Sequence, residues 1–168
     1  EQLGTGHAVL QAEPLLQGEA GTLLVTCGDT PLVTKETFTA LIDCHEQSGA
    51  AATVLTAHMP DPTGYGRVIR DEKGQVVKIV EQKDGTPEEL AVDEVNAGIY
   101  CFDMSLLWDM LHNVTNDNAQ GEYYLTDIIG MLVSAGKVVR AFAAPSYAET
   151  LGVNSRQQMA EAGRVLRQ

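Results

Sequence analysis

A short apolar segment that stops at a glycine and an acidic residue constrains the fold of this chain more than any other feature. The run Leu23-Leu24-Val25-Thr26-Cys27 precedes Gly28-Asp29, and such a run is typical of a buried strand in a parallel sheet. In open α/β sheets, ligands bind beyond the carboxyl ends of such strands. Gly28 would let the backbone approach a ligand, and the carboxylate of Asp29 could hold a divalent cation on phosphates. The alternative is that Asp29-Thr30-Pro31 only forms a turn.

The rest of the chain alternates strand and helix patterns, which predicts an α/β fold with a mixed, mostly parallel sheet. Thr5 is expected to cap a helix that reaches Leu16, and Thr34 a helix that ends at Gly49. This second helix lies between strand patterns at 22–27 and 51–57, so we expect those strands to form a parallel pair with a right-handed crossover. Further strands are expected at 66–70, 75–80, 94–102 and 138–143, and further helices from 87 and at 106–111, 124–135 and 155–167.

The composition fits one domain and argues against two classes of partner. Lys and Arg number 11 against 23 Asp and Glu, a net charge of −12 over 168 residues, and such a field repels nucleic acid. No apolar run approaches the ~20 residues that span a bilayer, and no cleavable signal is visible, so a cytoplasmic location is expected. A nucleotide-binding protein with this charge needs a metal ion, backbone N–H groups or a few well-placed cations.

Besides Asp29, three places carry polar groups suited to ligand binding. Gly4-Thr5-Gly6 would present backbone N–H groups at a helix start. Gly66 and Glu81 stand at the two ends of the hairpin pattern, and Asn96 interrupts an apolar strand while Asn154 precedes the last helix. Each place has a plain structural alternative: a capped helix, a strand-entry turn or solvated strand end, and an amide that is hydrogen-bonded internally or caps a helix.

Seven segments in this order resemble one known family. The chain is similar over essentially all of its length to the uridyltransferase domain of the bacterial bifunctional N-acetylglucosamine-1-phosphate uridyltransferase/glucosamine-1-phosphate acetyltransferases. Two segments are Gln2-Leu3-Gly4-Thr5-Gly6-His7-Ala8 and Asn118-Ala119-Gln120-Gly121-Glu122-Tyr123-Tyr124-Leu125-Thr126-Asp127, and their parts 2–7 and 118–124 are the most specific. The others are Gly28-Asp29-Thr30-Pro31-Leu32, Asp61-Pro62-Thr63-Gly64-Tyr65-Gly66-Arg67, Ile79-Val80-Glu81-Gln82-Lys83-Asp84, Glu94-Val95-Asn96-Ala97-Gly98-Ile99 and Gly152-Val153-Asn154.

The resemblance implies a Rossmann-like nucleotidyltransferase fold and a Mg²⁺-dependent reaction. UTP and N-acetylglucosamine 1-phosphate would give UDP-N-acetylglucosamine and pyrophosphate, a product used for peptidoglycan and lipopolysaccharide synthesis. The family's motifs imply Mg²⁺ ligands at Asp29 and Asn154, contacts to the uridine end at Gly4 and Thr5, and sugar contacts at Gly66 (through its backbone), Glu81 and Asn96. Cys27 departs from the Tyr often found before Gly-Asp, which is expected to alter packing beside the ribose.

The resemblance also implies that family segments are absent from 1–168. The first strands, a Gly-rich loop carrying Arg, a Lys and a C-terminal left-handed β-helix acetyltransferase domain have no counterpart here, and that domain would build a homotrimer. We therefore expect a partial sugar-nucleotidyltransferase domain with little or no activity alone. Two alternatives remain open at this point: a pyrophosphorylase for another nucleotide or sugar, and a non-catalytic sugar-nucleotide-binding module.

Overall fold

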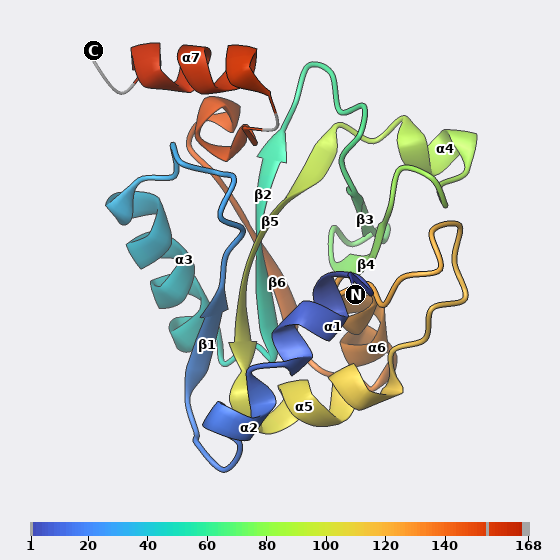
Figure 1. Ribbon diagram of the computed structural model, residues 1–168. Helices are drawn as coiled ribbons and strands as arrows, with labels where there is room; N and C mark the ends of the chain where they lie inside the picture. Colours follow the sequence, from blue (N-terminus) through green and yellow to red (C-terminus); the bar gives the residue numbers. More distant parts are fainter. Residues whose placement is uncertain (1, 154, 166–168) are drawn as a thin grey trace.

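A twisted sheet of six strands forms the centre of the protein in a computed structural model, which describes residues 2–153 and 155–165 (Figure 1). Five strands lie in the order β4-β3-β5-β2-β6, and β1 pairs with β5. β2 follows one edge of β5, while β1 and β3 pair with opposite ends of β5 and so share its other edge. The strands are β1 (Thr22–Val25), β2 (Ala52–His58), β3 (Arg67–Arg70), β4 (Val76–Val80), β5 (Glu94–Asp103) and β6 (Val139–Ala143).

The strand directions confirm a mixed sheet and correct its expected character. β5 runs antiparallel to β1, β2 and β3, and β3 runs antiparallel to β4. The parallel pair among the described strands is β2 with β6, so the expectation of a mostly parallel sheet is wrong. The expected parallel pair of the strands at 22–27 and 51–57 is wrong as well, because β5 lies between β1 and β2 and pairs with both.

The helices follow the predicted pattern except at the start of the chain. The helix expected to reach Leu16 is two helices, because Pro14 has no N–H to donate and its ring crowds the preceding turn. The elements are α1 (Thr5–Leu10), α2 (Glu13–Leu16), α3 (Lys35–Ser48), α4 (Pro87–Leu90), α5 (Met104–Asn113), α6 (Asp127–Ser134), the 3₁₀ turn η1 (Tyr147–Thr150) and α7 (Arg156–Val165).

Local capping signals predict the ends of α3 correctly but not the start of α1. The Thr34 hydroxyl accepts a hydrogen bond from the Thr37 N–H, and Gly49 ends α3 in the left-handed region with φ 59°. Thr5 is not the cap of α1: Gly4 holds that position, and the Thr5 side chain accepts a hydrogen bond from the distant connection between α5 and α6 instead. A partner far along the chain therefore overrides the local preference.

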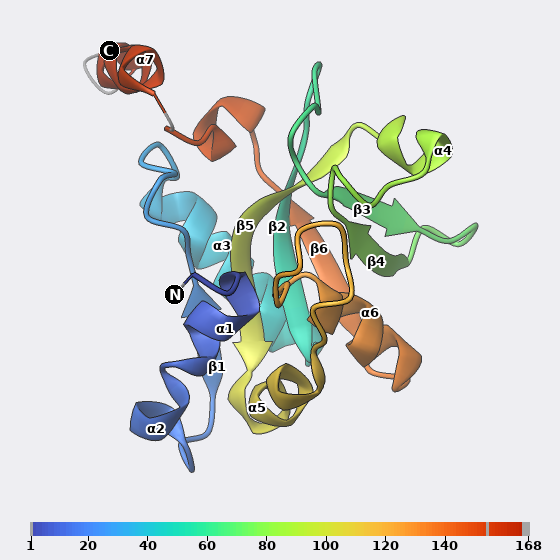
Figure 2. The same ribbon diagram turned by 45° about the vertical axis from the view of Figure 1, so that its right-hand side comes forward.

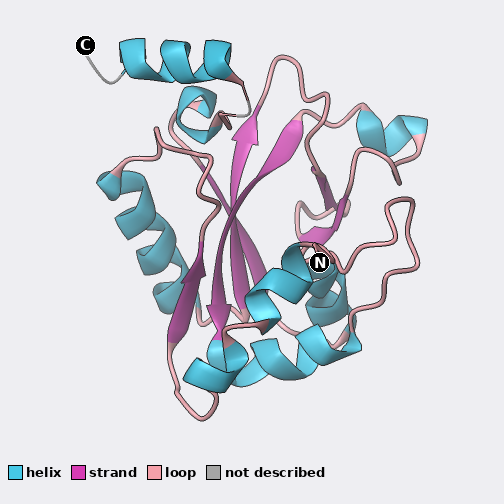
Figure 3. Ribbon diagram, in the orientation of Figure 1, coloured by secondary structure: helices cyan, strands magenta, loops and turns pink. Residues whose placement is uncertain are grey.

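Helices cover both faces of the sheet (Figures 2 and 3). The sheet therefore separates two large apolar clusters, one on each face. On one face, α3 packs Leu41 against Leu55 of β2 and Ile99 of β5. On the other face, α5 and α6 pack against Tyr100 and Phe102. Because side chains alternate along a strand, neighbouring residues of β5 serve different cores. Within residues 2–153 and 155–165, no helix is long and apolar enough to cross a membrane.

Candidate functional site

The two ends of the β3–β4 hairpin meet at a half-buried carboxylate. Glu81 directly follows β4, and its Oε1 accepts a hydrogen bond of 2.9 Å from the Thr126 hydroxyl at the start of α6. A Cβ atom placed on Gly66, just before β3, would lie 3.5 Å from both Glu81 carboxylate oxygens. Burial raises the pKa of Glu81, and three nearby acidic groups raise it further, while the Thr126 hydrogen bond opposes them. These three are Asp127, Asp84 and Glu122.

Asn96 of β5 joins this pair through the backbone. Its N–H donates to the carbonyl oxygen of Gly66 at 2.9 Å. Its side chain is also engaged, since Oδ1 accepts from the Gly98 N–H at 2.9 Å and Nδ2 donates to the Tyr100 hydroxyl at 2.6 Å. Gly66 therefore lies next to both Glu81 and Asn96.

The loop after β1 reaches the same region from the other side. The Cys27 thiol donates to the carbonyl oxygen of Gly98 at 3.3 Å, and a Cβ atom on Gly98 would lie 3.1 Å from that sulfur. Gly28 and Asp29 follow immediately, and no heavy atom lies within 4 Å of a Cβ atom placed on Gly28. β1 ends at Val25 rather than at Cys27, so Gly28 and Asp29 lie on a loop beyond the strand's carboxyl end.

A backbone hydrogen bond brings the segment after η1 to Asp29. The Val153 N–H donates to the Asp29 carbonyl oxygen at 2.7 Å. The predicted partner of Asp29, Asn154, lies outside the described residues. η1 is itself held against α3, because Glu149 Oε2 accepts from the Thr37 hydroxyl at 2.6 Å.

The amino-terminal motif packs against the segment that leads into α6. Gly4 has φ 108°, and a Cβ atom there would lie 2.7 Å from the Tyr123 carbonyl oxygen, so this close approach requires glycine. The Gly6 N–H donates to the same oxygen at 2.8 Å, and Thr5 Oγ1 accepts from the Leu125 N–H at 3.0 Å. A hollow of about 510 Å³ lies beside this motif and is lined by Gln2, Gly4, Thr5, His7, Gln11 and Glu122, among others.

These contacts form one connected path through the predicted site residues. It runs from Thr5 along residues 125–126 to Glu81 and Gly66, then through Asn96 and Gly98 to the loop that carries Asp29. Leu125, Thr126 and Gly98 on this path had no predicted role, and neither had Tyr100, which bonds to Asn96 beside it. Thr126 lies inside the motif segment 118–127, whereas the contribution of Tyr100 depends on an irregularity in β5 that the pattern of residues in the sequence does not show.

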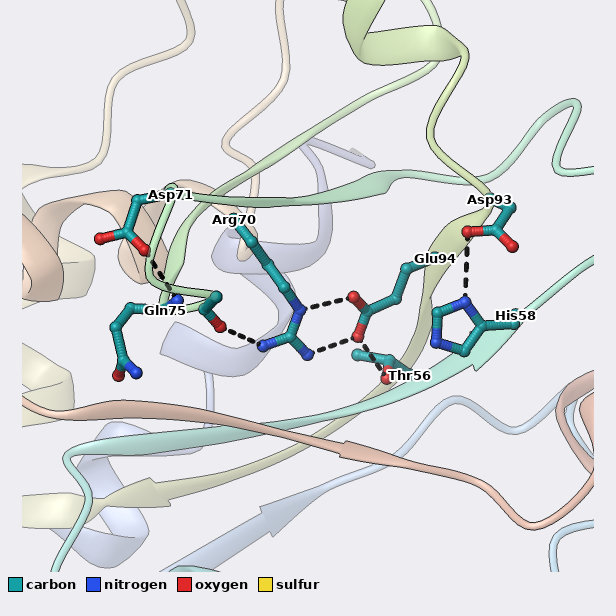
Figure 4. Close-up of polar contacts among 8 residues, drawn as sticks. Thr56, His58, Arg70, Asp71, Gln75, Asp93 and Glu94 are labelled. Atoms are coloured by element: carbon teal, nitrogen blue, oxygen red, sulfur yellow. Dashed lines mark hydrogen bonds and ion pairs between the residues drawn. The ribbon is translucent and has the colours of Figure 1, made fainter.

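An ion pair anchors the hairpin that carries Gly66 and Glu81. Arg70 donates to both carboxylate oxygens of Glu94, from Nε at 2.7 Å and from an Nη at 2.7 Å, and Thr56 donates to Glu94 at 2.9 Å (Figure 4). The side chain of Glu94 is 6% exposed. Among the described residues, β3 and β5 pair only through Arg67 and Val95. The Arg70–Glu94 ion pair therefore attaches the hairpin to β5 at a place where few backbone hydrogen bonds do so.

The donor set near Asp29 fits a hard cation. The exposed carboxylate of Asp29 lies beyond the carboxyl end of β1. The backbone of Asp29 is hydrogen-bonded to Val153, the residue before the predicted ligand Asn154. Mg²⁺ takes oxygen ligands and commonly uses one or two protein groups together with substrate phosphates and water. Among the described residues, no group of three or more His, Cys, Asp or Glu side chains could hold a metal ion.

Comparisons with known proteins agree with the resemblance drawn from the motifs. The chain is 59% identical over 166 residues to the bifunctional protein GlmU of Lactobacillus delbrueckii subsp. bulgaricus, with 99% of this chain and 36% of that protein covered. It is 57% identical to GlmU of Shouchella clausii (99% of this chain, 37% of that protein) and 55% identical to GlmU of Latilactobacillus sakei (100% and 36%). The chain thus spans little more than a third of the length of these curated relatives. Because the nucleotidyl transferase model also matches residues 1–148, the chain belongs to the nucleotidyl transferase family.

Proposed function

We propose that this protein transfers a uridylyl group from UTP to N-acetylglucosamine 1-phosphate, giving UDP-N-acetylglucosamine and pyrophosphate. One observation carries the proposal: the described residues that the motifs assign to nucleotide, sugar and metal are joined by hydrogen bonds, by adjacent backbone and by the close approach of Gly66 to Glu81. The names of the curated relatives, which describe bifunctional GlmU proteins, support it. The product would then feed cell-wall synthesis in the cytoplasm, and the second activity and a trimeric state would belong to segments beyond this chain.

The sugar would be held by both hydrogen-bond acceptors and hydrogen-bond donors. The Glu81 carboxylate accepts hydrogen bonds from sugar hydroxyls, while the Gly66 backbone and the Asn96 amide supply further polar contacts. Thr126 keeps Glu81 in place through its hydroxyl. Gly4 and Thr5 would lie toward the uridine end, beside the hollow at the amino-terminal motif.

Asp29, with Asn154, would hold Mg²⁺. A bound Mg²⁺ supplies neutralisation of phosphate charge, which a chain of net charge −12 needs in order to accept a triphosphate. The protein's own contribution is positioning, since phosphoryl-type transfer needs aligned reactants and charge stabilisation more than a covalent group from the enzyme. Gly28 leaves room for substrate to approach the loop backbone.

The test is a pyrophosphate-release assay on the full-length protein that contains this chain. Asp29→Ala is expected to lower turnover at least ~100-fold, as removal of a major electrostatic group does. Glu72→Ala is the matched control, because Glu72 is an exposed carboxylate at the turn of the β3–β4 hairpin. A near-wild-type rate for Asp29→Ala would refute the assigned metal role.

Two further measurements separate the alternatives. UTP, CTP, GTP and dTTP supplied in turn identify the base, and activity with a base other than uracil would replace the proposed substrate. Calorimetric binding of UDP-N-acetylglucosamine without any Mg²⁺-dependent turnover would indicate a binding module instead of an enzyme.

A further inference from the structure

The strand that carries Asn96 is irregular where it passes the candidate site. β5 pairs with β2 through Val54 opposite Tyr100 and Thr56 opposite Asn96. β2 therefore advances by two residues while β5 advances by four, which leaves two extra residues on β5. Gly98 lies inside this bulge with φ 74°. A bulge re-aims side chains and shortens the strand locally; in a regular strand, residues four apart would lie about 13 Å apart.

The bulge allows Asn96 and Tyr100 to bond to each other. The distance from Asn96 Nδ2 to the Tyr100 hydroxyl is 2.6 Å. The orientation of the amide is defined independently, because Oδ1 accepts from the Gly98 N–H at 2.9 Å and only an oxygen can face that donor. One amide hydrogen and one carbonyl lone pair of Asn96 then remain for a ligand.

Tyr100 is itself held rigidly. It is 4% exposed and belongs to the core on the α5 and α6 face. Its ring stacks on Phe102 with 5.5 Å between centroids and 20° between planes. Its backbone pairs with Val25 on one side and Val54 on the other. Because the ring is constrained, its hydroxyl is a hydrogen-bond acceptor in a fixed position for the more flexible Asn96 amide.

Tyr100 also stays protonated under ordinary conditions. Burial raises the pKa of its phenol strongly, and the nearby Glu81 and Cys27 act in the same direction, while the Asn96 bond opposes them. The hydroxyl accepts from Asn96 and keeps its own hydrogen to donate.

We propose that Tyr100 is a positioning residue for sugar recognition: its hydroxyl fixes the Asn96 amide in the orientation that binds the sugar. This rests on the proposed function, since Asn96 is assigned there to the sugar. The hydroxyl acts only through Asn96. Removing it leaves the amide held by the Gly98 N–H alone, so the amide is less restrained and binding has to order it further.

The test is a double-mutant cycle on the full-length protein, read as the dissociation constant of UDP-N-acetylglucosamine by calorimetry. Tyr100→Phe removes only the hydroxyl and keeps the stacked ring, and we expect about three- to tenfold weaker binding, the usual effect of one lost hydrogen bond. In the Asn96→Ala background, Tyr100→Phe is expected to change binding less than about 1.5-fold, because residues that act through one another are not additive. Tyr147→Phe, at an exposed tyrosine of η1, is the control and should bind as the unchanged protein does.

The outcomes are distinguishable. If Asn96→Ala weakens binding and Tyr100→Phe does not, or if Tyr100→Phe costs the same in both backgrounds, the positioning role is wrong. If Asn96→Ala itself binds normally, the proposed sugar contact is wrong and the positioning role falls with it.

A spectroscopic signature reports the contact without any ligand. In ¹⁵N NMR spectra the Asn96 side-chain amide should show a distinct hydrogen-bonded resonance that moves toward the free-amide position in Tyr100→Phe and stays in Tyr147→Phe. An unmoved resonance in a folded Tyr100→Phe protein would overturn the proposal.

Discussion

At the scale of single residues, the folded environment of Glu81 disfavours the charged form of its carboxyl group. Burial raises its pKa above the ordinary glutamate value, and the Thr126 hydroxyl only partly offsets this. A carboxyl group whose pKa is higher in the folded than in the unfolded state favours folding at low pH. That contribution is lost as the pH rises through the folded-state pKa. At neutral pH, Glu81 is therefore retained at a cost to stability, as is common for groups that bind ligands.

Glu81→Gln should separate stability from binding. The amide keeps an oxygen that can accept from Thr126 but carries no charge, so the free energy of unfolding at about pH 8 should rise by about 1 kcal/mol. The gain should be smaller at about pH 5, because lowering the pH favours the uncharged wild-type carboxyl, whose pKa burial raises. Urea unfolding at both pH values measures it, with Glu72→Gln as the exposed control. Equal or lower stability of Glu81→Gln at high pH would contradict the argument.

The same change should weaken binding of the sugar nucleotide. A neutral amide is a poorer acceptor for sugar hydroxyls than a carboxylate. Stabilisation together with reduced affinity for UDP-N-acetylglucosamine would identify Glu81 as a ligand-binding group. Stabilisation without any change in affinity would leave Glu81 as a structural residue only.

At the scale of elements, the hairpin of β3 and β4 depends on the Arg70–Glu94 pair. Burial raises the pKa of Glu94, but the hydrogen bonds and charge of Arg70 and the Thr56 hydroxyl outweigh this, and the pKa lies below its ordinary value. A carboxyl group with a lowered pKa stabilises the fold above its unfolded-state pKa. The stabilisation is lost as the pH falls through the folded-state value.

Arg70→Gln is therefore expected to destabilise the protein in a pH-dependent way. It leaves the Glu94 carboxylate buried without its cation. Because Arg70 is 37% exposed, we expect a loss of about 2 kcal/mol at about pH 7, which is less than the ~3–5 kcal/mol of a fully buried pair. The loss should be smaller at about pH 4, because lowering the pH favours the uncharged form of Glu94, which does not need a cation beside it. Urea unfolding at the two pH values measures this difference.

The control is Lys78→Gln at another hairpin ion pair. Lys78 is 47% exposed and lies 2.6 Å from Glu89, so its removal should cost less than about 1 kcal/mol. A pH-independent loss for Arg70→Gln, or equal losses for the two variants, would show that the buried pair does not anchor the hairpin through its charge.

The elements also show which parts of this structure a sequence can predict. The Thr34 cap and the Gly49 end of α3 depend on neighbours within a turn, and both were predicted. The break after α1 was not predicted, although Pro14 is a local signal for it in the sequence. The position of β5 between β1 and β2 was not, because strand order depends on pairing between distant segments. Asp29 could be proposed as a site residue from its place after a strand, whereas Tyr100 could not, because its contact with Asn96 depends on the bulge in the pairing with β2.

At the scale of the whole molecule, charge opposes folding. The chain carries 11 Lys and Arg against 23 Asp and Glu. In the described part of the chain, the carboxylates paired with a Lys or Arg within 4 Å are Glu89 and Glu94. Most acidic groups therefore repel one another through solvent, and folding brings them closer together.

Added salt should consequently stabilise this chain. The Debye length falls from about 30 Å at 10 mM salt to about 8 Å near 150 mM, which screens repulsion across the molecule while contact pairs such as Arg70–Glu94 are affected less. We expect the free energy of unfolding at about pH 7.5 to rise by about 1 kcal/mol between ~10 and ~200 mM KCl, measured by urea titration, and choline chloride should act equally. Lower stability at the higher salt concentration would mean that favourable pairs dominate. MgCl₂ at the same ionic strength separates screening from binding: an extra stabilisation that disappears in Asp29→Ala would arise from the proposed metal site, because a ligand that binds only the folded state raises its stability.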